Sequence, residues 1–542
     1  MESSKVYLKE IKTVLYEIIQ QENIDTILNF QLSKNKEYDI QCNDFVKFKE
    51  LPNGLKTKIE DKLSALIFIE ICSFSSNNFL NIRFSNIYFE NCLTAKQNYE
   101  KAEKKKVLLD YGGFNIGKAL HVGHIRSLNI GKSLKNCLKF VGYDVKSDIH
   151  YGDWGVQMAQ IISYIEKENI KVQRLSIEDL DLIYPKASKL SNENSEFSKM
   201  VSDTLQKLNN KDQEKMDIWK KIYKISTTEI EKILVNLEYE FDLHYGESDV
   251  VDLIPQLIKK YQKQKLIITD DGALIANDKQ DPPAILVKSD GTFMYLTTDI
   301  ATIVLREKDY KSDLYIYVTD QRQSFHFTQL FKMVGYLSLS NSDFRHVGFG
   351  TINDLEGKPL KTREGDVFKL LDLFDQIKIE ISKKNSDKKI VNTLAKSVMT
   401  YSDLATKRTS DYSFDIEKFV NINGKSAIYL QYSQVRARKL LENKKVIRKF
   451  TEFNDDERNL AKEIINFSFA LERTLDTLEP HHIAEYGYAL CQKFNAFYKN
   501  NKVLSEDINE IVSLSRLSLV DAFYETILYV FNCLGIEPVE TM

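Results

Sequence analysis

The sequence lacks paired cysteines. Its six cysteines are scattered, and no two of them have the C-x-x-C spacing that zinc knuckles use. This argues against a zinc knuckle, and we expect no zinc and no metal site. Single cysteines spread over 542 residues are typical of reduced thiols that fill the core in a reducing compartment.

Long apolar runs are also missing. No unbroken apolar stretch approaches the roughly 18–20 residues that cross a bilayer. The first residues, Met1 to Ser4, do not resemble a signal peptide. We therefore expect no membrane contact and a cytoplasmic location, although an organellar protein that has lost a transit peptide would fit the sequence as well.

The chain has no excess of positive charge. Its 75 Lys and Arg residues stand against 78 Asp and Glu residues, which gives a formal net charge of −3. Nucleic-acid binding cannot be argued from that total, so any basic surface must be local. Prolines number only eight, and we draw no function from their scarcity.

The patterns that are present divide the chain into three parts. With 43% hydrophobic residues a sizeable core is possible, and the length suggests about three domains. Residues 1–98 combine a helical pattern with an alternating strand at 78–84, typical of an α+β unit. Residues 105–415 alternate strands with helices, which favours a parallel sheet with crossovers. Residues 420–542 show only amphipathic helical patterns, which predict a bundle. Its four predicted helices cover 424–442, 456–477, 482–501 and 507–534.

An insertion interrupts the middle part at about residues 165–290. Residues 188–238 are charged and helical in pattern. Residues 268–277 and 285–296 each contain a glycine turn between apolar residues, which predicts two β-hairpins. We place this insertion at the edge of the main sheet.

The segment from Asp110 to His124 follows a short predicted strand and opens a predicted helix, 121–140. A helix N-terminus offers free backbone N–H groups and a partial positive charge, which suit phosphate. His121 and His124 lie on the same side of the first turn, and Gly123 lets a nucleotide approach the backbone. A surface pair or a metal-binding pair is the alternative, but a metal needs a further ligand, and no third histidine is placed convincingly.

In its context this segment resembles the HIGH signature of class I aminoacyl-tRNA synthetases. Asn115 and Lys118 resemble the arginine-specific form, in which Ser-Pro-Asn-x-x-Lys commonly precedes the signature. Gly113-Phe114 stands where the family usually has Ser-Pro, which alters the loop and keeps the asparagine. The resemblance implies a multidomain α/β protein. It would have a Rossmann-like parallel-sheet catalytic domain, an N-terminal α+β domain that contacts tRNA, and a C-terminal all-α anticodon-binding bundle.

Four further blocks match arginyl-tRNA synthetases in order and spacing. They are His150 to Gly155, Tyr245 to Ser248, Lys288 to Asp299 and Thr319 to His326. In the first, Gly152 and Gly155 are expected to shape the pocket floor. Carried over by position, the resemblance implies an arginine pocket lined by Asn115, Glu247, Tyr295, Asp299 and Gln323.

The chemistry of these five residue types agrees with such a pocket. A guanidinium is a permanently charged fork of donors, and carboxylates such as Glu247 and Asp299 select it through charge-assisted hydrogen bonds. Asn115 and Gln323 can bind the ammonium and carboxylate ends of the amino acid, and Tyr295 can close the pocket. Read singly, Asp299 could simply cap the next helix and Glu247 could be a solvated turn residue.

A basic loop follows at Gly357 to Gly365. Class I synthetases carry a mobile KMSKS loop near this position, and Lys361-Thr362-Arg363 resembles a variant seen in many arginine enzymes. The second KMSKS lysine has no clean counterpart, so its replacement stays open between Lys358, Lys361 and Arg363. A solvated loop is the alternative. The resemblance implies ATP binding by His121, Gly123, His124, His326, Lys358 and Lys361. It implies catalysis by His121, His124, Lys118, Lys361 and Arg363.

A basic helix begins after Tyr429-Leu-Gln-Tyr432. Cations beside aromatic rings can hold phosphates and stack bases, although a charge run is often just a solvated face. The run resembles the start of the anticodon-binding domain of arginyl-tRNA synthetases. It implies tRNA binding by Tyr432, Arg436, Arg438 and Lys439.

The resemblance therefore implies an arginine–tRNA ligase. Such an enzyme activates L-arginine with ATP and transfers it to tRNA(Arg), with Mg²⁺ as companion of ATP, and we expect a monomer. A cysteine-specific synthetase would need zinc ligands, and a glutamate-specific one would need basic residues where Glu247 and Asp299 stand. A non-catalytic tRNA-binding relative should have lost the histidine pair or the carboxylates, and a small-molecule nucleotidyltransferase would not need the bundle.

Overall fold

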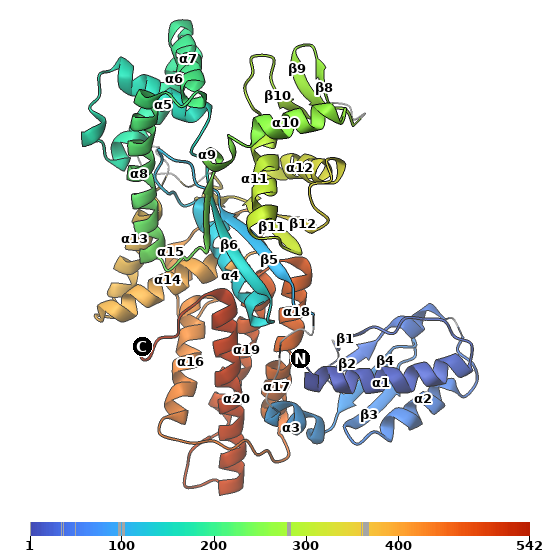
Figure 1. The fold of residues 1–542 in the computed structure, drawn as a ribbon. Helices are drawn as coiled ribbons and strands as arrows, with labels where there is room; N and C mark the ends of the chain where they lie inside the picture. The colour runs from blue at the N-terminus through green and yellow to red at the C-terminus, as the bar shows by residue number, and fades with distance from the viewer. Residues whose placement is uncertain are drawn as a thin grey trace.

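The computed structural model describes residues 2–542 except 34, 36, 49, 96–98, 100–102, 279–282, 359 and 361–367. A parallel sheet occupies the centre of the molecule (Figure 1). The C-terminal helices lie on one side of it and the inserted helices and hairpin on the other, while the N-terminal unit lies beside the C-terminal helices.

The central sheet has five parallel strands in the order β12-β11-β5-β6-β7. Its inner strands are almost continuously apolar and buried, as expected for a parallel sheet covered on both faces. The strands are β5 (Lys106–Gly112), β6 (Asp144–Tyr151), β7 (Leu243–Gly246), β11 (Leu314–Asp320) and β12 (Asp343–Phe349). The covering helices include α4 (His124–Phe140), α5 (Val156–Lys167), α11 (Tyr295–Asp309) and α12 (Ser324–Tyr336). The predicted parallel sheet is confirmed.

The strand order reverses between β5 and β11, because the chain builds outward from β5 in one direction and then restarts on its other side. In open sheets of this kind ligands bind outside the carboxyl ends of the strands at that switch point. The topology alone therefore directs attention to the residues that follow β5 and β11.

The helix that was predicted to begin at His121 begins at His124. The three preceding residues are held by another segment, since the Val122 N–H donates to the Phe368 carbonyl at 3.0 Å and His121 forms a β-bridge with Lys369. This tie keeps both imidazoles in a tight turn in front of the helix.

The N-terminal unit is the α+β structure that the sequence predicted. Its antiparallel sheet has the order β1-β2-β4-β3. The elements are α1 (Glu2–Gln21), β1 (Phe30–Leu32), β2 (Ile40–Cys42), η1 (Asp44–Lys47), α2 (Leu55–Ser64), β3 (Ile69–Phe74), β4 (Leu80–Phe84) and α3 (Asn86–Thr94).

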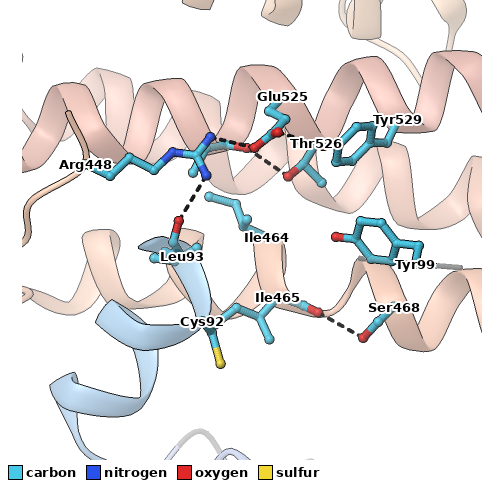
Figure 2. A pocket seen from close by; sticks show the side chains of 11 residues that line it. Cys92, Leu93, Tyr99, Arg448, Ile464, Ile465, Ser468, Glu525, Thr526 and Tyr529 are labelled. Carbon is cyan, nitrogen blue, oxygen red and sulfur yellow. Dashed lines mark hydrogen bonds and ion pairs between the residues drawn. The ribbon is translucent and has the colours of Figure 1, made fainter. Parts of the chain in front are cut away.

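Two arginines of the C-terminal part hold the N-terminal unit. Arg448 donates to the Leu93 carbonyl at 2.9 Å and to Glu525 at 2.6 Å, and Figure 2 shows it between helix α3 and the last bundle helix. Arg458 donates to Asp39 at 2.8 Å and is shielded from water, as is its partner. Because both guanidinium groups are largely buried, these contacts join the two parts firmly.

Both glycine turns that were predicted in the insertion are present. The hairpin at 268–277 is confirmed, and at 285–296 the chain also folds back around Gly291, with an antiparallel bridge between Val287 and Phe293, before α11 begins at Tyr295. Strand β10 pairs with β9, so β10-β9-β8 form a separate small sheet, whereas β7, which also lies within 165–290, is the edge strand of the main sheet. The elements are η2 (Val172–Arg174), α6 (Ile177–Glu193), α7 (Ser195–Asn209), α8 (Gln213–Asn236), α9 (Glu247–Val250), α10 (Ile254–Lys263), β8 (Ile267–Asp270), β9 (Ala273–Ala276) and β10 (Ile285–Val287).

The C-terminal bundle is all-helical, as predicted, with one extra break at Asn466 inside the predicted helix 456–477. Among the described residues, three helices, α13 to α15, lie between β12 and the bundle in sequence, and a two-stranded ladder joins residues 352–353 to 412–413. The elements are η3 (Gln321–Gln323), β13 (Ile352–Asn353), α13 (Leu370–Ser382), α14 (Lys388–Leu404), β14 (Tyr412–Ser413), α15 (Ile416–Phe419), α16 (Ala427–Leu441), α17 (Asp455–Ile465), α18 (Phe467–Thr477), α19 (His481–Asn500) and α20 (Glu510–Leu534).

Helix α20 corrects one expectation from the sequence. By length and composition it could span a membrane, since its most apolar window has a mean hydropathy of 1.3. A few polar residues interrupt it, so it contains no long unbroken apolar run. Two thirds of that window is buried, and the helix packs against α4, α16, α17 and α19. Its apolar character therefore serves the core of the bundle.

Candidate active site

A cavity of about 530 Å³ lies at the switch point of the sheet. Residues after β5, at the end of β11 and after β12 line it, so three strands contribute their carboxyl ends. Five of the predicted site residues meet there: Asn115, His121, Gly123, His124 and Gln323. Asp320 and Arg322 also line the wall and pair with each other at 2.7 Å.

The two histidines form a compact pair at the mouth of helix α4. Their ring centroids lie 4.0 Å apart. His124 Nδ1 accepts the backbone N–H of His121 at 3.0 Å, and His121 Nδ1 accepts the N–H of Gly123 at 3.1 Å. Since His121 Nδ1 accepts a hydrogen bond, the neutral His121 ring carries its proton on Nε2, whereas His124 Nδ1 also lies 3.2 Å from the His121 carbonyl, to which it can donate in the other tautomer.

Burial keeps both rings neutral. It lowers the pKa of His124 to about 3, with the charge of His121 acting in the same direction. Burial and the nearby Lys118 ammonium lower the pKa of His121. At neutral pH the pair therefore offers two N–H donors without a positive charge, which is suited to phosphate oxygens.

A smaller cavity, of about 160 Å³, lies between the Trp154 turn, α9 and the start of α11. Glu247 and Tyr295 line it together with Gly155. The Trp154 indole donates to the Asn209 side chain at 3.1 Å, so it has a structural partner. The structure thus divides four of the five predicted arginine-pocket residues between two cavities: Asn115 and Gln323 line the larger one, and Glu247 and Tyr295 line the smaller one.

Asp299, the fifth predicted pocket residue, lies one turn after Tyr295 on α11 and contacts His326. Its carboxylate binds His326 Nε2 at 2.5 Å, and His326 lies three residues after Gln323, which lines the larger cavity. Burial, then the negative charges of Asp299 and Asp153, raise the pKa of Glu247 to about 8. A bound cation would offset the cost of ionising Glu247 beside these two charges.

Buried polar side chains beneath α11 fix its position. Arg306 is 1% exposed; it donates to Asp110 at 2.6 Å and also to Asp148, so it ties the helix to β5 and β6. Burial lowers the pKa of Arg306, but its two carboxylate partners outweigh this and raise it well above the usual value. Arg306 and Asp299 are seven residues apart on the same face of α11, so this anchor sets the placement of Asp299.

Asp153 is a further residue that the sequence patterns missed. It is fully buried, and it accepts hydrogen bonds from the Ser248 N–H at 2.9 Å and the Ser248 hydroxyl at 2.6 Å. It therefore holds the turn that presents Glu247. The Gly-Asp-Trp-Gly block contained the signal, but a turn with a buried indole explained the block without giving the aspartate a role.

The cationic residues predicted for catalysis lie outside both cavities, as far as the structure describes them. Lys118 Nζ stands 4.0 Å from the Tyr184 ring centroid. Lys358 is exposed and pairs with Glu356 at 2.9 Å. Lys361 and Arg363 fall outside the described residues.

The predicted tRNA-binding residues lie on α16. The guanidinium of Arg436 is stacked between the Tyr432 and Tyr498 rings, 4.5 Å from each centroid, and donates to Asn495 and to the Tyr432 hydroxyl. A neighbouring arginine, Arg438, donates to the Glu540 carbonyl, whereas Lys439 is exposed. The arginines thus brace this surface, and two half-exposed tyrosine rings flank it.

The comparisons with known proteins agree with this arrangement. Residues 88–416 match the family described as tRNA synthetases class I (R), catalytic domain, and residues 430–542 match the DALR anticodon binding domain. An arginine–tRNA ligase of Francisella tularensis is 32% identical, covering 93% of this chain and 94% of the relative. One from Alkaliphilus oremlandii is 30% identical, covering 99% of this chain and the whole of the relative.

Solved structures show the same likeness. The arginyl-tRNA synthetase of Plasmodium falciparum superposes with a TM-score of 0.81 at 25% identity, covering 98% of this chain and 99% of that one. The Thermus thermophilus enzyme has the same fold, with a TM-score of 0.80 at 19% identity, over 98% of this chain and all of that one. The family match spans more than half of the chain, and the relatives cover nearly all of it. The chain therefore belongs to the arginine branch of the class I aminoacyl-tRNA synthetases.

Proposed function

We propose that this protein is an arginine–tRNA ligase that makes arginyl-adenylate from L-arginine and ATP and then arginylates tRNA(Arg). The observation that carries the proposal is the pairing of two sites. A neutral histidine pair opens onto the cavity at the switch point, and Glu247, whose charge interacts with that of Asp299, lines a second cavity. The first suits the phosphates of ATP and the second suits a guanidinium.

In the first step an arginine carboxylate oxygen attacks the α-phosphorus of ATP. The bond from that phosphorus to the bridging oxygen breaks, and pyrophosphate leaves with the electron pair. We assign to His121 and His124 the hydrogen bonds that stabilise charge on the phosphate oxygens, and to Lys118, Lys358, Lys361 and Arg363 the role of cations brought in around the leaving group. Gly123 and His326 complete the proposed ATP contacts.

Mg²⁺ would accompany ATP and neutralise phosphate charge. Asp320 is the acidic residue among the described residues that line the larger cavity, and Arg322 already pairs with it. A single engaged carboxylate fits the usual mode of Mg²⁺, which takes most of its ligands from phosphates and water.

For the amino acid we propose that Glu247 and Asp299 bind the guanidinium, that Asn115 and Gln323 bind the α-ammonium and carboxylate, and that Tyr295 covers the pocket. The Tyr295 ring is 65% exposed, so it has freedom to close over a substrate. Arg306 and Asp153 hold the two carboxylates in place from behind.

Arginine binding should strengthen as the pH rises toward 8. The pKa of Glu247 is raised to about 8, so below that pH the empty pocket holds a proton that a guanidinium must displace. The dissociation constant should fall by up to about tenfold per pH unit below 8 and level off above it. Calorimetric titrations at pH 6.5, 7.5 and 8.5 would measure this. Glu247→Gln should bind weakly with little pH dependence; an equally steep dependence in that variant would contradict the assignment.

In the second step a hydroxyl of the terminal tRNA adenosine attacks the arginyl carbonyl, and AMP leaves. We propose that the bundle holds the anticodon through Tyr432, Arg436, Arg438 and Lys439. Tyr432→Leu should raise the tRNA dissociation constant roughly 5- to 100-fold, because a stacked base contributes about 1–3 kcal/mol. Filter binding would measure it, and arginine affinity in the same variant should stay unchanged. A general loss of arginine binding would mean that the variant is misfolded.

The decisive experiment is amino-acid-dependent ATP–pyrophosphate exchange, run with and without tRNA(Arg). We expect exchange with arginine and none with lysine, cysteine or glutamate. Exchange that responds to another amino acid, or tRNA binding with no exchange at all, would favour a different synthetase or a non-catalytic tRNA-binding protein.

We further propose a division into residues 1–98, 105–415 and 420–542, with the insertion at about 165–290, and a cytoplasmic monomer. Gel filtration with light scattering would test the monomer. A mass near twice the 62.9 kDa of one chain would overturn it.

A further inference from the structure

A second cluster of donor groups lies in the turn between α18 and α19, away from both cavities. It consists of Glu479, His481 and His482. Their side chains are only 8–13% exposed, so the cluster is sheltered yet within reach of solvent. These residues form no cysteine pair and lie far in sequence from His121 and His124, so the sequence patterns did not indicate the cluster.

The distances within the cluster are longer than hydrogen bonds and slightly longer than the spacing between two ligands of one zinc ion. His481 Nδ1 lies 3.8 Å and His482 Nε2 lies 3.6 Å from the same Glu479 oxygen, Oε2. Both distances are too long for hydrogen bonds. Ligands of a tetrahedral zinc ion are about 3.3 Å apart when the bonds are about 2.0 Å long. Shifts of a few tenths of an ångström would bring the carboxylate oxygen to that spacing from both rings.

One of the donors is buried without a partner. His481 Nδ1 is shielded from solvent and has no hydrogen-bond partner among the described residues. A buried polar atom in that state costs free energy unless something fills the gap. All three ligand atoms lie within 4.8 Å of one another, so a single ion could satisfy them together.

We propose that Glu479, His481 and His482 bind a divalent transition metal of the zinc class. Two imidazoles and one carboxylate form a common donor set for such ions, and water would complete the coordination.

The surroundings limit the affinity. The positive charges of Lys407 and Arg473 act on the two histidines, and Arg408 faces Glu479, whereas Glu485 adds one further negative charge nearby. A dication is therefore attracted less than in an acidic site. We expect binding that micromolar metal concentrations reveal and that a strong chelator reverses.

The position of the site gives the metal a structural task. Leu478, directly before the cluster, adopts a left-handed conformation (φ 53°) and accepts a hydrogen bond from Arg408 at 3.2 Å. Arg408 also donates to the Gly348 carbonyl at 2.6 Å, next to residues that line the larger cavity. A metal in this turn would hold the bundle against the end of β12.

The proposal can be tested with Co²⁺ and Zn²⁺ on the full-length protein. After chelation and dialysis, Co²⁺ should produce a visible absorption band that saturates near one ion per chain, and Zn²⁺ should displace it. Zn²⁺ should also raise the melting temperature by about 2–5 °C, as a ligand specific for the native state does. His482→Ala and the conservative Glu479→Gln should each lose the band, whereas the exposed His244→Ala should retain it.

The contrary outcomes are distinct. Absence of the band at 100 µM Co²⁺, about tenfold above the micromolar range expected here, would overturn the proposal and leave an ordered water as the occupant. A band that survives in both His482→Ala and Glu479→Gln would also overturn it, because the metal would then sit elsewhere, for example on His121 and His124. Loss of metal with unchanged arginine-dependent exchange would leave the proposed ligase function intact, since the two sites are separate.

Discussion

Replacing Asp299 with asparagine should weaken arginine binding roughly 30- to 700-fold and leave ATP binding within about twofold of the parent. The guanidinium would lose one of its two anionic partners, a change worth about 2–4 kcal/mol at a partly buried charge pair. The asparagine is nearly isosteric and keeps an oxygen toward His326, so the fold should hold. Calorimetry with arginine and, separately, with ATP would measure both constants.

The matched control is Asp309→Asn, which makes the same charge change at an exposed position of the same helix. It should bind arginine like the parent. An unchanged dissociation constant in Asp299→Asn would show that the guanidinium binds elsewhere. A loss of both arginine and ATP binding would point instead to a displaced α11, the effect expected from breaking the Arg306 anchor.

The second large effect is expected from His124→Ala. Removal of one preorganised donor to phosphate should reduce arginine-dependent pyrophosphate exchange about 100- to 1,000-fold. Arginine binding should change little, because the ring is assigned to the phosphates of ATP and does not line the cavity of Glu247, which binds the guanidinium. Exchange kinetics and arginine calorimetry on the same preparation would separate the two effects.

Two companion variants sharpen this test. His124→Gln places an amide N–H near the position of Nε2 and should recover part of the lost exchange rate. If the His124 ring only filled space, glutamine would not restore the rate. His244→Ala removes an exposed histidine of β7 and should behave as the parent. Equal exchange rates for His124→Ala and the parent would remove His124 from the mechanism.

The sequence predicted those features that depend on local periodicity and on short motifs. The alternation of buried strands and helices defined the parallel sheet, and the glycine-histidine turn marked the end of the first strand. The histidine pair and the Asn115, Glu247 and Asp299 positions could be carried over because their blocks are short and ordered. At Gly291 the same reasoning predicted the turn correctly but not how soon the returning segment ends, because α11 begins at Tyr295, two residues after the bridge from Val287 to Phe293.

Contacts between distant residues could not be predicted in this way. Arg306 meets Asp148 and Asp110, which are 158 and 196 residues away in sequence, and no local pattern relates them. The protonation of Glu247 likewise depends on the joint presence of Asp153, Asp299 and a covering structure. Glu479, His481 and His482 are close in sequence, but the burial that makes them a candidate metal site depends on the packing of the turn, which composition does not reveal.

The packing of α4 against α20 has a consequence for synthesis in the cell. Ser133 on α4 donates to the Cys533 carbonyl at 2.8 Å, across 400 residues of sequence. At a translation rate of about 5–20 residues per second, roughly 20 to 80 s separate the appearance of these two partners. Throughout that interval one side of the helix that carries His124 has no permanent cover. The nascent chain therefore exposes this apolar face of α4 for a time in which chaperones can bind it. A chain released from a ribosome that stalls within the bundle would lack α20, so α4 would keep that face exposed.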